Sequence, residues 1–231
     1  MKSGGQTNHG LSEQAREQGN FVEALKFSDE ALVGYAEAND WFGFCDILSS
    51  RVLTLRHLFE KTGKREYLVV AKHTAMAAVE IAENSGDPSI AMMPYSKMGR
   101  VQHDLGELRD SAASYEKAVN LMIQNPPKEH NRPSVLADLK IHMEVVKYKT
   151  GDKDALSRLE TALTELEAAD EEKYNKDTWM SGAHMRMAEI LKSDNPQKAK
   201  EHLSKAKQII DANPELKLRS EQWEKLAKSL S

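Results

Sequence analysis

Eight histidines are the side chains of this sequence best suited to bind a metal or to transfer a proton. Two metal ligands on one face of a helix lie three or four residues apart, and no two of these histidines have that spacing. His142-Met143 and His184-Met185 recur 42 residues apart, which indicates a repeated structural position. We therefore expect no metal site. The histidines are His9, His57, His73, His103, His130, His142, His184 and His202.

The residues that could carry nucleophilic or phosphate chemistry are few. The single cysteine, Cys45, lies within the apolar stretch from Trp41 to Ile47, which predicts a packed thiol. The glycines are isolated, so no glycine-rich phosphate loop is present, and no Gly-x-Ser-x-Gly motif occurs. Glu171 and Glu172 fall at a predicted helix end, where solvated charges are ordinary. We expect no catalytic residues, no cofactor and no enzymatic activity.

Composition narrows the classes of partner. The net charge of −4 comes from 36 acidic and 32 basic residues spread along the 231-residue chain, so no basic stripe indicates binding to nucleic acid. The apolar stretches are short and interrupted by charges, which predicts no membrane insertion. With only one cysteine, no internal disulfide can form, which agrees with a reducing compartment. We expect a cytoplasmic protein.

The elements that must position any site are predicted from a repeat of about 44 residues. Turn signals recur near Gly19, Gly63, Gly106, Gly151 and Asn195, and each is followed by a helix with two small residues seven apart. Seven residues are about two helical turns, so both small residues lie on one face, where a neighbouring helix can approach closely. The predicted helix pairs are 9–18 with 20–38, 41–61 with 64–84, 88–105 with 107–124, 133–149 with 152–170, and 176–192 with 196–211.

The clearest repeat unit runs from residue 95 to residue 118, and its distinctive positions are Tyr95, Met98, Gly99, Gly106, Leu108, Ser111, Tyr115 and Ala118. These residues resemble the aromatic, leucine, small and turn positions of the tetratricopeptide repeat family. The usual unit of that family has 34 residues, and the longer units here are similar to the extended repeats of kinesin light chains and of Rap-type peptide sensors. The resemblance implies an all-α, right-handed α-solenoid of about five hairpins with a C-terminal capping helix.

The predicted domain organisation follows the repeat. Residues 1–8 are expected to be a flexible leader. The repeats span 9–212, with units at about 9–39, 40–86, 87–130, 131–173 and 174–212. Residues 213–231 are expected to form the capping helix, with Leu216, Trp223, Leu226 and Leu230 as its apolar contacts.

The resemblance also implies a function, because such repeats bind polypeptides on the concave side lined by their first helices. Polar residues that recur there with the period are the candidate partner-binding residues: Glu13, Arg16, His57, Glu60, Ser96, Arg100, His103, Asp104, Arg186 and Glu189. The main hypothesis is a scaffold or adaptor that holds a partner peptide or helix. The alternatives are a peptide-responsive regulatory sensor and the repeat region of a larger signalling protein. The sequence does not predict the oligomeric state.

Overall fold

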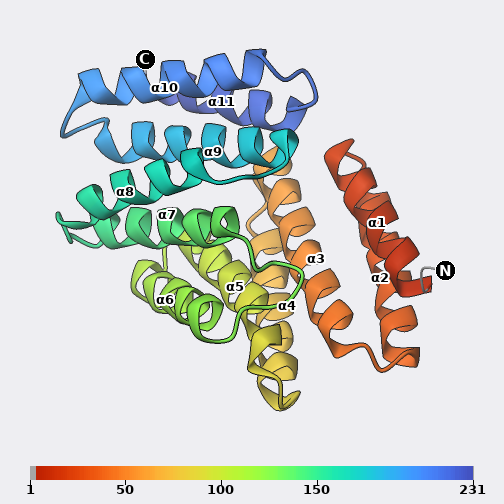
Figure 1. Cartoon of the computed structure of the whole chain (residues 1–231). Coiled ribbons are helices and arrows are strands. Elements are labelled where there is room, and N and C mark those ends of the chain that lie inside the picture. Colours follow the sequence, from red (N-terminus) through yellow and green to blue (C-terminus); the bar gives the residue numbers. More distant parts are fainter. Residues whose placement is uncertain (1–3, 231) are drawn as a thin grey trace. The chain divides into compact units, whose positions relative to one another are not determined.

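Helices account for most of the chain in the computed structural model, which describes residues 4–230 (Figure 1). That part of the chain contains eleven α-helices, one short 3-10 helix and no strand. The helices group into two compact units, one ending at His130 and the other beginning at Asn131. Each unit is described separately below.

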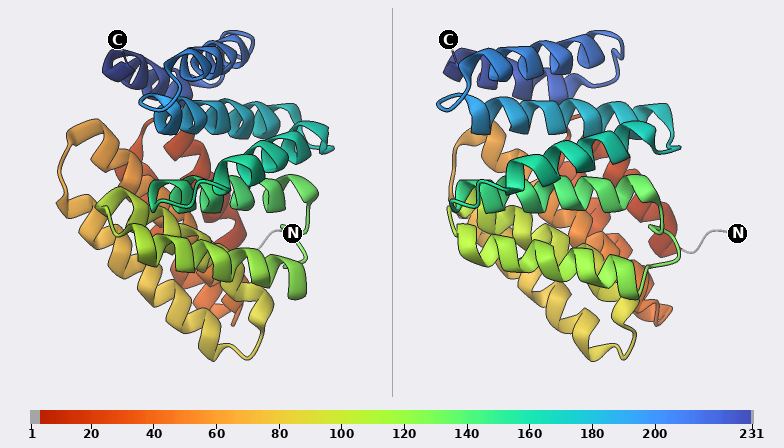
Figure 2. Two further views of the ribbon diagram at one scale, coloured as in Figure 1. Left: turned by 90° about the vertical axis from the view of Figure 1, so that its left-hand side faces the viewer. Right: turned by 60° about the vertical axis from the view of Figure 1, so that its left-hand side comes forward.

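Unit 1 consists of three helical hairpins. Each first helix packs on its second helix, and the first helices α1, α3 and α5 also pack on one another in that order. Figure 2 shows the paired helices of each hairpin lying side by side. The elements are α1 (Gly4–Glu17), α2 (Phe21–Glu37), α3 (Trp41–Thr62), α4 (Glu66–Asn84), η1 (Pro88–Ala91), α5 (Met92–Leu105) and α6 (Leu108–Gln124).

Unit 2 contains two more hairpins and a final helix. The first helices α7 and α9 pack together, and α11 lies against both α9 and α10. The elements are α7 (Pro133–Lys149), α8 (Ala155–Ala168), α9 (Lys173–Leu191), α10 (Pro196–Asp211) and α11 (Lys217–Leu230). The predicted number of hairpins and their order along the chain are therefore observed.

The turns between helices form where the sequence signals them. The carboxylate of Asp40 accepts a hydrogen bond of 2.9 Å from the backbone N–H of Gly43 and so caps the start of α3. Gly63 and Gly106 end α3 and α5 with φ angles of 71° and 84°, in the left-handed region that favours glycine. Asn195 caps α10 by accepting from the N–H of Lys198 at 3.0 Å. Asp40 thus marks the start of the second hairpin, whereas Gly63, Gly106 and Asn195 mark the turn between the two helices of a hairpin.

The small residues that recur seven apart are buried in all five second helices, as the sequence predicted. Each has at most 4% of its surface exposed, so a neighbouring backbone approaches where a larger side chain would not fit. The five pairs are Ala24 and Ala31, Ala71 and Ala78, Ser111 and Ala118, Ala155 and Ala162, and Ala199 and Ala206.

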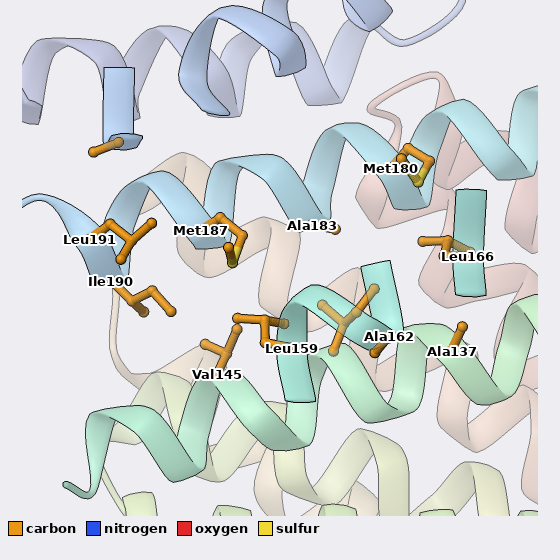
Figure 3. Close-up of a cluster of buried hydrophobic side chains, with 12 residues drawn as sticks. Ala137, Val145, Leu159, Ala162, Leu166, Met180, Ala183, Met187, Ile190 and Leu191 are labelled. Carbon is orange, nitrogen blue, oxygen red and sulfur yellow. The ribbon is translucent and has the colours of Figure 1, made fainter. Parts of the chain in front are cut away.

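The core of unit 2 shows how these small positions work with larger apolar ones (Figure 3). Leu159 and Leu166 on α8 are fully buried on either side of Ala162. Leu159 lies toward Val145 on α7, and Leu166 lies toward Met180 on α9. Removing this apolar surface from water is the dominant favourable contribution to folding. The first helices are thereby fixed relative to one another within unit 2.

The beginning of the chain differs from the expected flexible leader. Helix α1 begins at Gly4, so residues 4–8 are helical, and residues 1–3 of the predicted leader lie outside the described part. The reason is a close helix crossing, because a Cβ atom on Gly34 would lie only 2.6 Å from the backbone nitrogen of Gly5. Gly5 is also buried against the ring of Tyr35. Gly5 and Gly34 thereby allow α1 and α2 to touch.

The final helix contacts unit 2 less deeply than a core helix does. Leu216, just before α11, is 4% exposed, whereas α11 itself contains no fully buried residue. Trp223 contributes through its indole N–H, which donates to the carbonyl of Leu203 at 2.9 Å. The helix therefore covers the end of the last hairpin with half-buried side chains.

Candidate functional site

Half-exposed side chains follow one side of α3, the central first helix of unit 1. Phe42, Asp46, Leu53, His57 and Glu60 are half-exposed at helical spacing, while most residues between them are buried. We use the name first-helix face for this line together with Arg56 of α3 and the adjoining residues of α1 and α5, which are Glu13, Arg16, Ser96, Lys97, Arg100, His103 and Asp104.

An ion pair joins the second and third hairpins within this face. The Arg56 guanidinium on α3 donates from Nε to the Asp104 carboxylate on α5 at 2.6 Å, and both side chains are largely buried. Burial alone would raise the pKa of Asp104, but the Arg56 charge, with a hydrogen bond from His103, holds it well below its usual range. Arg56 was missed by the sequence analysis, which selected its neighbour His57.

The two α3 residues that the sequence did predict, His57 and Glu60, lie next to Arg56. His57 Nδ1 is 3.2 Å from Glu60 Oε2, and Glu60 Oε1 is 3.7 Å from the Arg56 guanidinium. Burial lowers the pKa of His57, although the Glu60 carboxylate opposes that shift. The His57 ring also stacks on Phe21 of α2, with ring centroids 5.8 Å apart. His57 therefore has a packing role as well as a polar one.

Arg16 connects the first hairpin to the second. Its guanidinium donates to the Ser50 hydroxyl on α3 at 2.6 Å and lies 3.0 Å from Glu17 and 3.8 Å from Glu13. Arg16 is only 8% exposed, so it is mainly a structural contact between α1 and α3. Glu13 stays half-exposed beside it.

The two further α5 residues predicted in the third hairpin differ in accessibility. Ser96 is 5% exposed and is therefore poorly placed to touch a partner. Arg100 is half-buried and lies one helical turn before Asp104. The usable part of α5 on this face consequently runs from Arg100 to Asp104.

Arg186 and Glu189 belong to unit 2. Both lie on α9, where Glu189 accepts from Lys149 of α7 at 2.8 Å. This contact connects two first helices in the way that Arg56 and Asp104 do in unit 1. The ten predicted residues therefore fall into two separate sets, eight in unit 1 and two in unit 2.

A second polar cluster on α3 was also missed by the sequence analysis. The Asp46 carboxylate is 3.6 Å from Nε2 of His130, and the His130 ring lies near Phe42 with centroids 6.1 Å apart. Burial would raise the pKa of Asp46, but the interaction with His130 and the charges of His9 and Lys97 lower it. Asp46 lies one turn after Phe42 on the same line as His57, and this periodicity is the signal that could have identified it.

Most of the predicted charges are neutralised by partners within the chain. Glu13, His57, Glu60 and Asp104 all have ion-pair partners within 4.0 Å, and Glu189 has one in unit 2. A face of paired charges offers both donors and acceptors to a ligand without a strong field of one sign.

Several residues considered for catalysis or metal binding occupy packed positions. Cys45 is 1% exposed, and burial raises its pKa to about 12, so it is the packed thiol that was predicted. His142 and His184 are each 6% exposed, in agreement with a repeated structural position. The structure also brings Nδ1 of His184 and Nδ1 of His202 to 2.9 Å, a pairing that their spacing of 18 residues did not indicate. Within residues 4–230, no group of three or more potential ligands could hold a metal.

Glu171 is not the solvated helix-end charge that the sequence suggested. Its side chain is 2% exposed and accepts from the Arg132 guanidinium at 2.8 Å and from the Ser134 hydroxyl at 2.5 Å. The Glu171 carboxylate, which lies in the segment before α9, therefore holds that segment against the start of α7. Arg132 in turn lies over the Trp179 ring, 5.7 Å from its centroid.

Comparisons with known proteins reveal likeness in structure. No protein family model matches the chain, and no curated protein matches its sequence. Among helices in the described part of the chain, none combines the length and apolar character needed to cross a membrane.

Several solved structures are similar over most of the chain. A putative kinesin light chain from Podosopora anserina with nearly identical TPR-like repeats is 13% identical, with a TM-score of 0.57 over 92% of this chain and 99% of that one. A crystal structure of a substituted form of that protein has a TM-score of 0.58 at 12% identity, covering 90% and 95%. BtubC (BKLC) from P. vanneervenii is 18% identical, with a TM-score of 0.55 over 87% and 78%. The chain therefore has the fold of tetratricopeptide-like helical repeats, the α-solenoid class that its sequence resembles.

Proposed function

We propose that this protein is a scaffold or adaptor that holds a partner polypeptide, as an extended peptide or a helix, on the first-helix face of unit 1. The observation that carries the proposal is the side-by-side packing of α1, α3 and α5. It gathers residues from three successive hairpins, which lie far apart in the sequence, into one surface. TPR-like repeats are a protein-interaction fold, which supports the same function.

The chemistry of the face favours a polypeptide of mixed charge. The largely buried pair of Arg56 and Asp104 fixes α5 against α3, so a partner would meet the more accessible His103 and Glu60 in positions that are already set. Half-exposed Leu53 and Phe42 add apolar contact area between the charged groups. In such an arrangement, apolar contacts supply much of the affinity and polar groups supply orientation and specificity.

Site-specific cross-linking tests this assignment. A photo-reactive amino acid placed at His103 should become linked to the partner, and mass spectrometry should identify both the partner and the linked segment. The same amino acid at exposed Arg109 on the second helix α6 is the matched control. Efficient linking from position 109 with none from position 103 would place the partner elsewhere.

A second candidate function is a peptide-responsive sensor. It is favoured by the repeat architecture, since within each unit successive hairpins pack on one another and small rotations between them can add up when a ligand binds. Small-angle scattering with and without the bound partner would show a change in the radius of gyration. An unchanged radius at saturation would leave the scaffold as the better description.

A further inference from the structure

The short segment after α6, residues 125–130, turns back onto the first helices of unit 1. The carbonyl of Pro127 accepts a hydrogen bond from the N–H of His130 at 3.1 Å, which closes a tight turn. Pro127 is buried, whereas Pro126, Lys128 and Glu129 are exposed. The turn therefore presents the His130 side chain from a partly rigid backbone.

His130 meets two residues that lie one helical turn apart on α3. The Phe42 ring is tilted by 31° against the imidazole at a centroid distance of 6.1 Å, and the Asp46 carboxylate lies 3.6 Å from Nε2. Phe42 thus lies beside the ring, and the Asp46 carboxylate faces its Nε2 atom at ion-pair distance, beyond hydrogen-bond length. This combination fits a planar side chain that can carry a positive charge, because both the ring face and the cation gain a favourable contact.

The charged groups that act on Asp46, besides His130, come from α1 and α5. His9 on α1 and Lys97 on α5 add positive charge near the carboxylate, while Glu13 and Glu129 add negative charge near the adjacent Tyr35 hydroxyl. Tyr35 itself is tied to His9, with 3.0 Å between its hydroxyl and Nδ1. The Asp46 carboxylate is therefore the point on α3 where the charge of a bound residue would be balanced.

We propose that Phe42 and Asp46 form a subsite of the first-helix face for a histidine or arginine of the partner, and that His130 occupies this subsite until the partner displaces it. The inference rests on the proposed function, since it names one contact of that surface and its internal competitor. A tethered segment competes at an effective concentration of about 1 mM, so its removal should strengthen partner binding measurably.

The test uses the full chain and the segment itself as the probe. A synthetic peptide of residues 124–131 is titrated into the isotope-labelled His130→Ala chain and into the unaltered chain, with backbone NMR shifts around residues 42–46 as the readout. We expect binding to the His130→Ala chain to be at least about tenfold tighter, because the tethered competitor is gone. Equal binding to both chains, or none to either, would overturn the proposal.

Matched controls distinguish specific recognition of the histidine from non-specific binding of the peptide. A peptide with alanine in place of the histidine should not bind, and adding Asp46→Asn to the His130→Ala chain should abolish binding. Glu80→Gln on the exposed side of α4 should leave it unchanged. Circular dichroism checks that the Asp46→Asn variant folds. If it does not, Phe42→Leu is introduced into the His130→Ala chain instead. Unchanged binding of the peptide to that variant would contradict the subsite.

The outcomes also distinguish this inference from the proposed function. If cross-linking at position 103 identifies a partner whose affinity is the same for the unaltered and His130→Ala chains, the internal competitor is refuted and the scaffold assignment stands. If position 103 never links to a partner while the peptide binds as expected, the scaffold assignment fails and the subsite stands.

Discussion

The Arg56 guanidinium and the Asp104 carboxylate meet at 2.6 Å between α3 and α5, although 48 residues separate them in the sequence. Their side chains are 11% and 16% exposed, so the pair is well shielded from water and salt. The ion pair fixes the register of two first helices at the point where the candidate partner-binding residues are densest.

Replacing Asp104 with asparagine should lower the free energy of unfolding by about 2 kcal/mol, because a largely buried guanidinium loses its counter-charge. Urea denaturation followed by circular dichroism measures this change. The matched control is Asp29→Asn, which removes an exposed ion pair with Arg51 and should cost at most about 1 kcal/mol. Equal losses in the two variants would show that burial adds nothing to the Arg56 pair.

The contribution of Asp104 should also depend on pH. Its pKa in the folded state lies well below that of the unfolded chain, so the stabilisation is fully present above about pH 4 and is lost as the pH falls through the folded-state pKa. The difference in stability between the unaltered chain and Asp104→Asn should therefore be constant from about pH 5 to about pH 7 and shrink in more acidic solution. A difference that grew on acidification would contradict the ion-pair explanation.

Gly43 should not tolerate a side chain. A Cβ atom there would lie 2.2 Å from Cε1 of the Tyr35 ring, which itself packs between Gly43 and Gly5. We expect Gly43→Ala to lower the free energy of unfolding by about 2 kcal/mol through overpacking. Gly10→Ala on α1 is the control, because nothing lies within 4 Å of its added Cβ, and it should stabilise by up to about 1 kcal/mol. Thermal denaturation of the two variants compares them directly.

The buried pair of His184 and His202 should make unit 2 sensitive to acid. Burial, with the neighbouring charges of His202 and Lys205, lowers the pKa of His184 to about 4. The unfolded chain therefore binds a proton near pH 6.5, whereas His184 in the folded chain binds one only near pH 4. The free energy of unfolding should fall by about 3 kcal/mol as the pH falls from about 6.5 to 4. The His184→Phe variant should lose less over this range, as measured by urea denaturation at several pH values.

The control for this pH dependence is His73→Gln, which alters an exposed histidine on α4. It should follow the curve of the unaltered chain. If His184→Phe also followed that curve, a group other than the histidine pair would be responsible for the acid sensitivity.

The fold could be predicted from the sequence because its determinants are local and periodic. Paired small residues such as Ala71 and Ala78, and turn residues such as Gly63 and Gly106, mark each hairpin within a stretch of about 44 residues. The helix at residues 4–8 was missed because the residues there are small and polar, as in a flexible leader, whereas Gly5 makes a close contact with Gly34 and Tyr35.

The candidate site was predicted only in part, because its contacts join helices that are distant in sequence. The repeat period placed His57, Glu60, Arg100 and Asp104 on adjoining helices. It could not show that Arg56 would neutralise Asp104. Pairings such as Asp46 with His130, and His184 with His202, depend on how helices and turns pack, which the spacing of residues along one helix does not encode.

The central claim is that the first-helix face of unit 1 binds the partner. It is tested most directly by titration calorimetry with a synthetic peptide of the partner segment that cross-linking identifies. The double variant Arg100→Ala and His103→Ala is compared with Arg109→Ala, whose altered residue is exposed on α6. We predict an affinity loss of at least about tenfold, or about 1.4 kcal/mol, for the double variant and no loss for Arg109→Ala. Unchanged affinity in a correctly folded double variant would contradict the account.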